Sequence, residues 1–120
     1  MPRASTLYLR DMLDAIQRIY RYIDPFEKAS FVTSEMVRDA VVLNLMIIGE
    51  AAGRLDESIT DAHESVDWRN IKGLRNIIAH EYFRLKFERL WNIIETELPL
   101  LKDQISTILT TLDEKDDSDG

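Results

Sequence analysis

Residues 41–48 read VVLNLMII, and this run decides the fold. Its apolar side chains fall on nearly every side of a helix, a pattern typical of a helix that is buried all round. Thr33 or Ser34 can cap this helix, Glu35 lies favourably near its N-terminal dipole, and the helix should continue to about Leu55. In so short a chain, such a helix needs a central position or a second subunit that covers its other face. Dimerisation is the simpler explanation, and a central helix in a monomer is the alternative.

The segments on both sides of this run also show the 3.6-residue spacing of apolar side chains. Before it, the spacing predicts a helix from about Thr6 to Ile23, which Pro25 ends. After it, Asp67 can cap a helix from Trp68 to about Tyr82, and another helix starts at Leu85. No sustained alternation of apolar and polar residues predicts a strand.

Pro99 interrupts the last helical pattern. Because proline cannot donate a hydrogen bond to the preceding turn, it should kink the helix or split off a segment from Leu100 to Leu112. We therefore expect an all-α fold, an up-and-down four-helix bundle whose last helix is kinked or split. Residues 113–120 carry no apolar side chain. We expect a helical domain over residues 1–112 and a disordered acidic tail over residues 113–120.

The composition excludes several kinds of site. The chain has 120 residues, which is the size of one domain, and it has no cysteine. Disulfides, thiolate zinc sites and cysteine nucleophiles are therefore excluded. The first residues have no apolar signal-peptide core, and no apolar stretch approaches the ~20 residues of a membrane span. We expect a cytoplasmic protein with no membrane partner.

The charge of the chain is unevenly distributed. The formal net charge is −7, which by itself argues against a nucleic-acid partner. Residues 68–92, however, contain six basic and two acidic side chains. An anionic ligand is therefore credible at this segment, although the same residues would also suit a solvated helix face.

The basic segment separates into two arcs when it is placed on a helical wheel at about 100° per residue. The arc expected to face the core holds Ile71, Leu74, Ile77, Ile78 and Tyr82. The opposite arc holds Lys72, Gly73, Arg75, Asn76, Ala79 and His80. Asn76 and His80 are i, i+4 neighbours, so one can orient the other, whereas Arg75 and His80 lie about 140° apart. A two-fold axis would bring two copies of Arg75 and His80 into one cleft.

The run Arg75-Asn76-Ile77-Ile78-Ala79-His80-Glu81-Tyr82 has the pattern Arg, four residues, His, one residue, Tyr. In this it resembles the HepT-like toxins of the HEPN superfamily. Other stretches resemble the same family: Ile48-Gly49-Glu50-Ala51, Trp68-Arg69-Asn70-Ile71-Lys72-Gly73-Leu74, Leu90-Trp91-Asn92-Ile93-Ile94 and Glu97-Leu98-Pro99. The resemblance covers roughly residues 6–112, and the motif shows no departure from the family pattern.

The resemblance implies a HEPN-like homodimer that acts as a metal-independent ribonuclease toxin and needs no cofactor. It implies Arg75 and His80 as catalytic residues at the dimer interface. It also implies a minimal nucleotidyltransferase (MNT) antitoxin that silences the toxin by attaching AMP to the motif tyrosine, here Tyr82. On the wheel Tyr82 lies about 20° from Arg75, so we expect the AMP phosphate to occupy the place of the scissile phosphate without any conformational change.

These residue types suit RNA cleavage. The reaction needs a group that removes the 2′-hydroxyl proton, a group that protonates the leaving oxygen, and positive charge at the phosphorus. Two His80 rings across a dimer would be base and acid, and Arg75 would bind phosphate oxygens. Asn76, Lys72 and Tyr82 would position the substrate.

Each site residue also has a structural alternative. In a purely structural role, His80 would be a helix-end histidine that is hydrogen-bonded to a carbonyl group. Arg75 would then be a surface residue that forms an ion pair with Glu81 or Glu50. An unpaired Glu50 would be costly in its apolar helix, so we expect it to have a structural partner, with Arg75 as the candidate.

The two tryptophans and the second histidine fit structural roles. We expect His63, in a polar connection, to be exposed and without a special role. Trp68 and Trp91 should be core or interface anchors. At the level of the whole protein, the alternative to a ribonuclease is a non-catalytic helical partner that serves as the substrate of a nucleotidyltransferase.

Overall fold

A computed structural model describes the backbone of residues 2–119 and the side chains of residues 5–114. Within this range the protein is all-α, as the sequence predicts, with seven α-helices, one 3-10 helix and no strand. None of the described helices is both long enough and apolar enough to cross a membrane. The elements are α1 (Pro2–Ile23), α2 (Lys28–Thr33), α3 (Glu35–Gly53), α4 (Glu57–Ala62), α5 (Trp68–Glu81), η1 (Tyr82–Arg84), α6 (Phe87–Thr96) and α7 (Leu98–Asp119).

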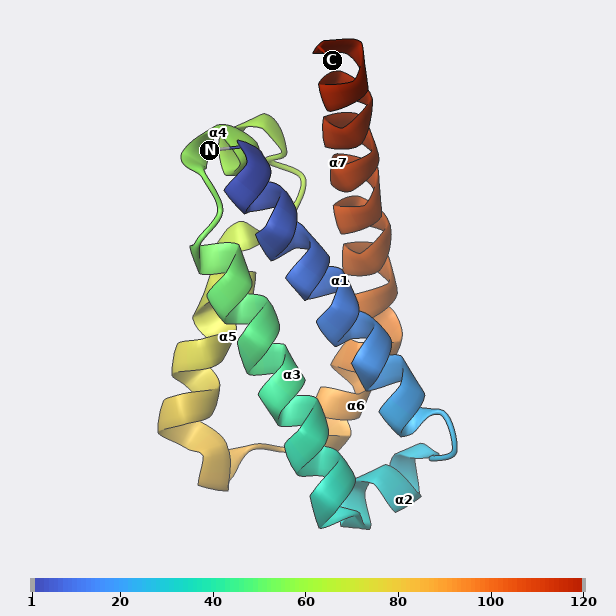
Figure 1. The fold of residues 1–120 in the computed structure, drawn as a ribbon. Helices are drawn as coiled ribbons and strands as arrows, with labels where there is room; N and C mark the ends of the chain where they lie inside the picture. Colours follow the sequence, from blue (N-terminus) through green and yellow to red (C-terminus); the bar gives the residue numbers. More distant parts are fainter. Residues whose placement is uncertain (1, 120) are drawn as a thin grey trace.

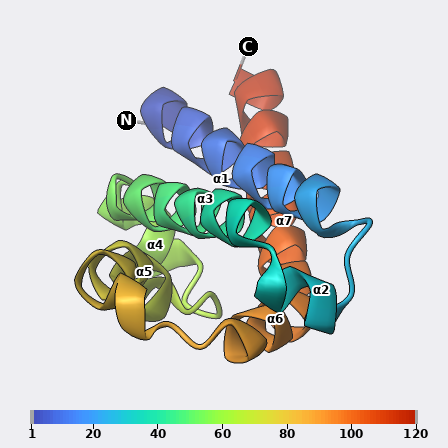
Figure 2. The ribbon, with the colours of Figure 1, turned by 90° about the horizontal axis from the view of Figure 1, so that it is seen from below.

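The long helices follow the predicted up-and-down order. In Figure 1, α1 runs down, α3 returns upward, α5 runs down again, and α6 with α7 leads back to the end that holds the N-terminus. The view from below in Figure 2 shows α5 on one side of α3, while α6 and α7 lie on the other side of the bundle. The sequence did not predict α2, α4 and η1. Each has six residues or fewer, too few for an apolar periodicity to show.

The last helical segment is split in two near Pro99. The sequence predicts either a kink or a split there, and the structure has the split. Helix α6 ends at Thr96, and α7 begins at Leu98, one residue before the proline. Helix α7 then continues to Asp119, past residue 112, because residues 113–119 contain no proline or glycine that would end it. The division into a domain and a disordered tail stays a prediction, and Gly120 lies outside the described residues.

The core lies where α1 meets α3 and α7. Leu9, Met12 and Ile16 of α1 are completely buried, as are Val41 of α3 and Ile105 of α7. Both tryptophans are core residues, as predicted, and the ring of Trp91 packs on that of Phe31 in α2 with centroids 5.2 Å apart.

One buried polar group fixes α1 against α3. The Asn44 side chain accepts a hydrogen bond of 2.7 Å from Arg18 Nε and donates one of 2.8 Å to the Ala40 carbonyl. Asn44 is only 3% exposed, so losing either partner would leave a buried amide group unpaired. The asparagine inside the apolar run therefore stabilises one arrangement of the two helices.

Gly49 lets α3 and α5 approach each other closely. A Cβ atom at this position would lie 2.9 Å from the Ile71 carbonyl oxygen and 3.2 Å from the Arg75 backbone nitrogen. Real Cβ atoms do not approach a backbone oxygen so closely, so a larger residue would push α5 away. The glycine thus sets the distance between the helix that carries the motif and the rest of the fold.

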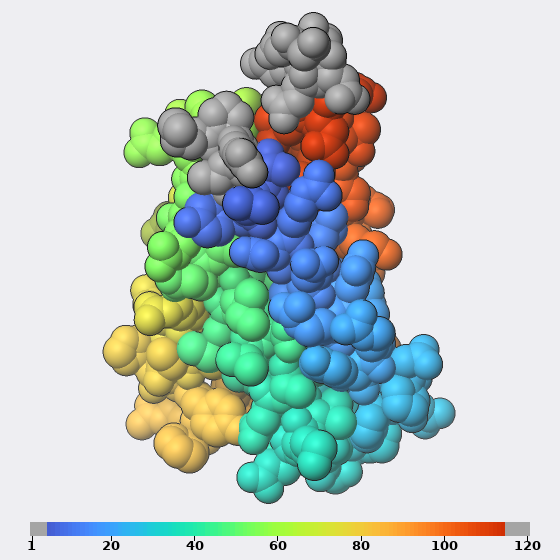
Figure 3. Space-filling model, in the orientation of Figure 1, coloured from blue at the N-terminus to red at the C-terminus, as the bar shows by residue number. Residues whose placement is uncertain are grey.

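Within a single chain, the helix through residues 41–48 is not buried all round, and the coverage of its open side by a second subunit stays a prediction. Figure 3 shows α3 reaching the surface between α1 and α5, and Leu43 is 57% exposed. Helix α5 packs mainly on α3, and Ile77, predicted to face the core, is 52% exposed. Ile77 lies at the edge of its apolar arc on the wheel, so a single neighbouring helix does not cover it.

We expect Gly49→Ala to lower the free energy of unfolding by roughly 1–3 kcal/mol, because the added methyl group overpacks the α3–α5 contact. Gly73→Ala in α5 is the matched control: its Cβ would meet nothing within 4 Å, and alanine favours the helix by up to about 1 kcal/mol. Urea denaturation of both variants tests this. Equal effects of the two changes would show that the contact does not constrain α5.

Candidate functional site

Helices α3 and α5 run antiparallel and form a long surface seam, which we call the α3/α5 seam. Two depressions lie along it. The cationic depression is lined by Gly49, Glu50, Gly53, Arg54, Lys72, Arg75 and Asn76. The apolar depression is lined by Asp39, Val42, Leu43, Met46, Ile78, Ala79 and Tyr82.

Glu50 joins two arginines in the cationic depression. Its Oε2 accepts from Arg75 Nε at 3.1 Å, and its Oε1 accepts from Arg54 Nε at 3.3 Å and from Nη2 at 3.2 Å. The pKa of Arg54 is raised, mainly by the hydrogen bond to Glu50 and then by one to Tyr8. The predicted partnership of Glu50 with Arg75 is confirmed. The side chains of Glu50 and Arg75 are 45% and 56% exposed, so the pair is open to solvent.

Tyr82 lies at the other end of the seam. Its hydroxyl donates a hydrogen bond to Asp39 Oδ1 of α3, and its ring packs edge-on against the ring of Phe83. This hydrogen bond raises the pKa of Tyr82, because ionisation would remove the donated proton and place a phenolate beside a carboxylate. Helix α5 ends at Glu81, so Tyr82 is the first residue of η1 and not the last of a continuous helix.

His80 is exposed on α5 and lines neither depression. No hydrogen bond or ion pair joins it to another residue in the described part of the chain. Five residues separate it from Arg75, which corresponds to about 7.5 Å along the helix axis and about 140° around it. One chain therefore does not bring the guanidinium and the imidazole together, in agreement with the wheel.

The structure thus divides the predicted site residues into three groups. Lys72, Arg75 and Asn76 line one depression, Tyr82 lines the other, and His80 lies apart from both. The predicted orienting contact is missing, because no hydrogen bond joins Asn76 to His80 among the described residues. Their i, i+4 spacing only permits that contact, and both side chains are solvated.

Two residues of the seam were not predicted from the sequence. Arg54 follows Glu50 by four residues, a spacing that favours an ion pair on a helix and would have indicated it. Asp39 precedes Glu50 by eleven residues, three helical turns, and therefore shares its face of α3. Most residues between Asp39 and Glu50 are apolar, so the face of α3 that these two carboxylates share was not recognised from the sequence.

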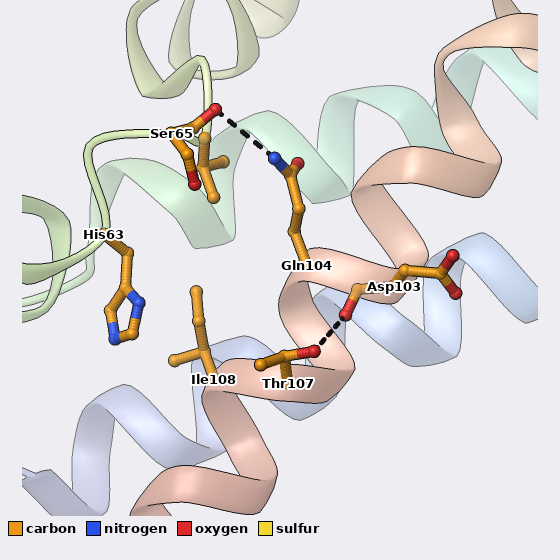
Figure 4. Close-up of a pocket in the computed structure, with 7 residues that line it drawn as sticks. His63, Ser65, Asp103, Gln104, Thr107 and Ile108 are labelled. Atoms are coloured by element: carbon orange, nitrogen blue, oxygen red, sulfur yellow. Dashed lines mark hydrogen bonds between the residues drawn. The ribbon is translucent and has the colours of Figure 1, made fainter.

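A third depression, on the side of the molecule where the α4–α5 connection meets α7, has no comparable set of charges. Figure 4 shows His63 and Gln104 on opposite sides of it. Gln104 Nε2 donates to the Ser65 carbonyl at 3.3 Å, and Trp68 Nε1 donates to the His63 carbonyl at 2.9 Å. His63 is half-buried, not exposed as predicted, because this folded-back connection packs beside α7. Its surroundings fit a structural role.

The described side chains include no group of three or more histidine, aspartate or glutamate residues that could hold a metal ion. The α3/α5 seam offers fixed positive charge and hydrogen-bond donors, and α5 also carries the exposed imidazole of His80. Arginine and lysine at a solvent-open depression bind anions such as phosphate.

Comparison with known proteins adds an independent line of evidence. The model of the family described as "Ribonuclease HepT-like" matches residues 12–108. The chain is 31% identical over 102 residues to "Putative RNase TTE0752" of Caldanaerobacter subterraneus, covering 85% of this chain and 91% of that protein. It is 29% identical over 101 residues to "Putative RNase MJ1380" of Methanocaldococcus jannaschii, covering 84% and 93%.

A further relative, "Probable ribonuclease HepT" of Thermococcus cleftensis, is 27% identical over 108 residues, which cover 90% of this chain and 98% of that protein. No solved structure matches the chain significantly. The match with the family model includes α3, α5 and both depressions of the seam.

We expect Asp39→Asn to lower the pKa of Tyr82 toward the ordinary value of 10.0, because the substitution removes the carboxylate that disfavours the phenolate. In the native protein the Tyr82–Asp39 hydrogen bond should stabilise the fold fully below pH 10.0 and lose its effect as the pH rises through the raised pKa. NMR titration of the Tyr82 ring measures this pKa. Asp61→Asn, the same charge change on α4, is the control, and an equal response to both changes would contradict the assignment.

Proposed function

The chain belongs to the ribonuclease HepT-like family, and on this premise we propose that it is a metal-independent endoribonuclease toxin of a HEPN/MNT toxin–antitoxin pair. It cleaves RNA at a site that forms where two copies of the chain meet. Arg75 and His80 are its catalytic residues. The names of its relatives support ribonuclease activity, and the arrangement of the motif on α5 supports the shared site.

One observation carries the proposal: both motif residues are exposed on the open side of α5, yet they face different directions. Arg75 pairs with Glu50, but a structural histidine would also have a partner within the fold, and His80 has none among the described residues. A second α5 related by a two-fold axis supplies a His80 near each Arg75, since residues close to such an axis meet their own copies.

The uncovered apolar surface of the same two helices supports the homodimer. Leu43 of α3 and Ile77 of α5 are each more than half exposed, and Met46 and Ile47 are half-buried. Large aliphatic side chains at such exposure are typical of a surface that a partner covers. Burial of these side chains in a dimer restores the all-round burial that the run at residues 41–48 indicates.

The chemistry follows from the side-chain types that meet in the shared cleft. An imidazole can both accept and donate a proton, so one His80 removes the 2′-hydroxyl proton and the other protonates the leaving 5′-oxygen. Arg75, already held at Nε by Glu50, directs its remaining donors at the phosphate oxygens and stabilises the charge that develops there. Lys72 and Asn76 position the RNA.

The regulatory part of the proposal concerns Tyr82. The partner is a nucleotidyltransferase of the MNT type that transfers AMP from ATP to the Tyr82 hydroxyl. Tyr82 lines the apolar depression, and its hydroxyl donates to the exposed carboxylate of Asp39. The added phosphate brings negative charge to the seam that holds Arg75 and thereby opposes RNA binding.

We expect purified protein to cleave single-stranded RNA in the presence of EDTA. Arg75→Ala should lower kcat/KM by roughly 10²–10³-fold through lost charge stabilisation, and His80→Ala by roughly 10²–10⁴-fold through lost proton transfer. Gel or fluorescence assays of RNA cleavage, with circular dichroism to confirm folding, measure both effects. Full activity of His80→Ala would overturn the assigned site.

Mixing subunits tests the shared cleft. When wild-type and His80→Ala chains are refolded together in varying ratio, activity should fall with the square of the wild-type fraction, because only wild-type pairs contain both imidazoles. A linear fall would show that each chain cleaves alone. Wild-type protein mixed with Asp61→Asn chains, which carry their substitution on α4, is the control for the mixing itself.

We expect a nucleotidyltransferase of the MNT type with ATP to add AMP to wild-type protein and not to Tyr82→Phe, as intact-mass spectrometry would show. Modified wild type should lose RNA cleavage, because the attached phosphate competes at the seam. Modification without any RNA cleavage by the unmodified protein would instead support the alternative, a non-catalytic partner of the nucleotidyltransferase.

A further inference from the structure

The cationic depression extends beyond the motif arginine to the end of α3. Arg54 is the C-cap residue of α3, and it lines the depression together with Lys72 and Arg75 of α5. Glu50 is the only acidic residue among those that line it. Three positive charges and one negative charge leave an excess of two positive charges, in a chain whose formal net charge is −7. Such a local excess attracts polyanions.

The arginines keep donors for a ligand. A guanidinium has five N–H donors, and the bonds to Glu50 use only Nε and Nη2 of Arg54 and Nε of Arg75. Arg54 has a further hydrogen bond with Tyr8, but other N–H groups of both arginines remain available, since the side chains are 58% and 56% exposed. Glu50 therefore fixes two guanidinium groups beside each other without occupying them fully.

One part of the lining leaves room for an approaching backbone. Gly53 of α3 lines the depression, and a Cβ atom added there would meet nothing within 4 Å. Lys72 precedes Arg75 by one helical turn, about 4.5 Å along the axis of α5. The basic groups thus extend as a track from Arg75 toward Arg54.

We propose that Arg54, together with Lys72, binds an RNA phosphate next to the one that is cleaved at Arg75. The inference rests on the proposed ribonuclease function and adds a residue outside the Arg-x4-His motif. Arg54 acts in binding and leaves the proton-transfer steps to His80. It therefore sets the affinity for RNA and not the rate of the chemical step.

The competing explanation is that Arg54 only holds Glu50 in place. In that case Arg54→Gln would release Glu50, disturb Arg75, and lower kcat along with stability. Loss of a phosphate contact instead raises KM and the Kd for RNA, leaves kcat within about twofold, and reduces the salt dependence of binding. The two explanations therefore differ in their kinetic signature.

Arg10→Gln is a matched control. Arg10 is an exposed arginine on α1, and its Nη2 pairs with Asp113 at 3.3 Å, so its side chain resembles that of Arg54 in exposure and pairing. The same substitution removes the same charge away from the α3/α5 seam. Any effect of the net charge of the chain appears equally in both variants.

The experiment measures binding of fluorescein-labelled single-stranded RNA of mixed sequence by anisotropy, with His80→Ala chains so that the RNA stays intact. Adding Arg54→Gln should raise Kd by roughly three- to tenfold at low salt and reduce the slope of log K against log salt by about 0.7. Adding Arg10→Gln should leave both nearly unchanged. RNA cleavage by the single variants Arg54→Gln and Arg10→Gln gives KM and kcat.

Equal effects of Arg54→Gln and Arg10→Gln on Kd would overturn the phosphate subsite while the ribonuclease function stands. A fall in kcat at unchanged KM for Arg54→Gln would assign Arg54 to positioning Arg75 and would also overturn the subsite. If wild-type protein neither cleaves nor binds RNA, the proposed function fails and the subsite fails with it. The wild-type cleavage assay separates this last outcome from the other two.

Discussion

The functional face depends on the close approach of α3 to the backbone of α5 at Gly49. The missing side chain allows the Ile71 carbonyl and the Arg75 amide to lie against α3. Because the two helices are antiparallel, this single contact brings Arg75 beside Glu50 and sets the register of the whole seam. Helix α5 has few other contacts with the bundle, so little else could restore the arrangement if the helices moved apart.

In this arrangement the carboxylate of Glu50 orients the side chain of Arg75, although both lie in a depression that we propose binds an anion. A negative charge beside an arginine weakens phosphate binding through repulsion, but it also fixes a long and flexible side chain. Arg75 and Glu50 are both about half exposed, so water screens the repulsion while the hydrogen bond at Nε still orients the guanidinium. The excess of basic residues around Glu50 then keeps the depression positive overall.

Much of the architecture follows from the spacing of apolar residues, and the exceptions have physical causes. The long helices, the split at Pro99 and the pairing of Glu50 were all predicted, because periodicity, proline stereochemistry and the cost of an unpaired charge act locally. The exposure of Ile77 and Leu43 was not predicted, because it depends on which helices cover which face. Asp39 was missed for a related reason, because its partner Tyr82 lies across a contact between helices that a single wheel does not contain. Arg54 pairs with Glu50 on its own helix, and their i, i+4 spacing would have indicated the pair.

The position of Tyr82 changes the physical account of how AMP would act. The wheel places Tyr82 about 20° from Arg75, and on that basis we expect an attached phosphate to need no movement. A wheel leaves out the distance along the axis, however, which is about 10.5 Å for seven residues. In the structure Tyr82 begins η1, donates its hydroxyl proton to Asp39, and lies seven residues from Arg75, about two helical turns. Attachment of AMP removes that proton, so the hydrogen bond is lost and a phosphate faces the Asp39 carboxylate. Because the like charges repel, the modified side chain must leave Asp39. The positive charges that would attract its phosphate are those of the cationic depression, which lies along the same seam.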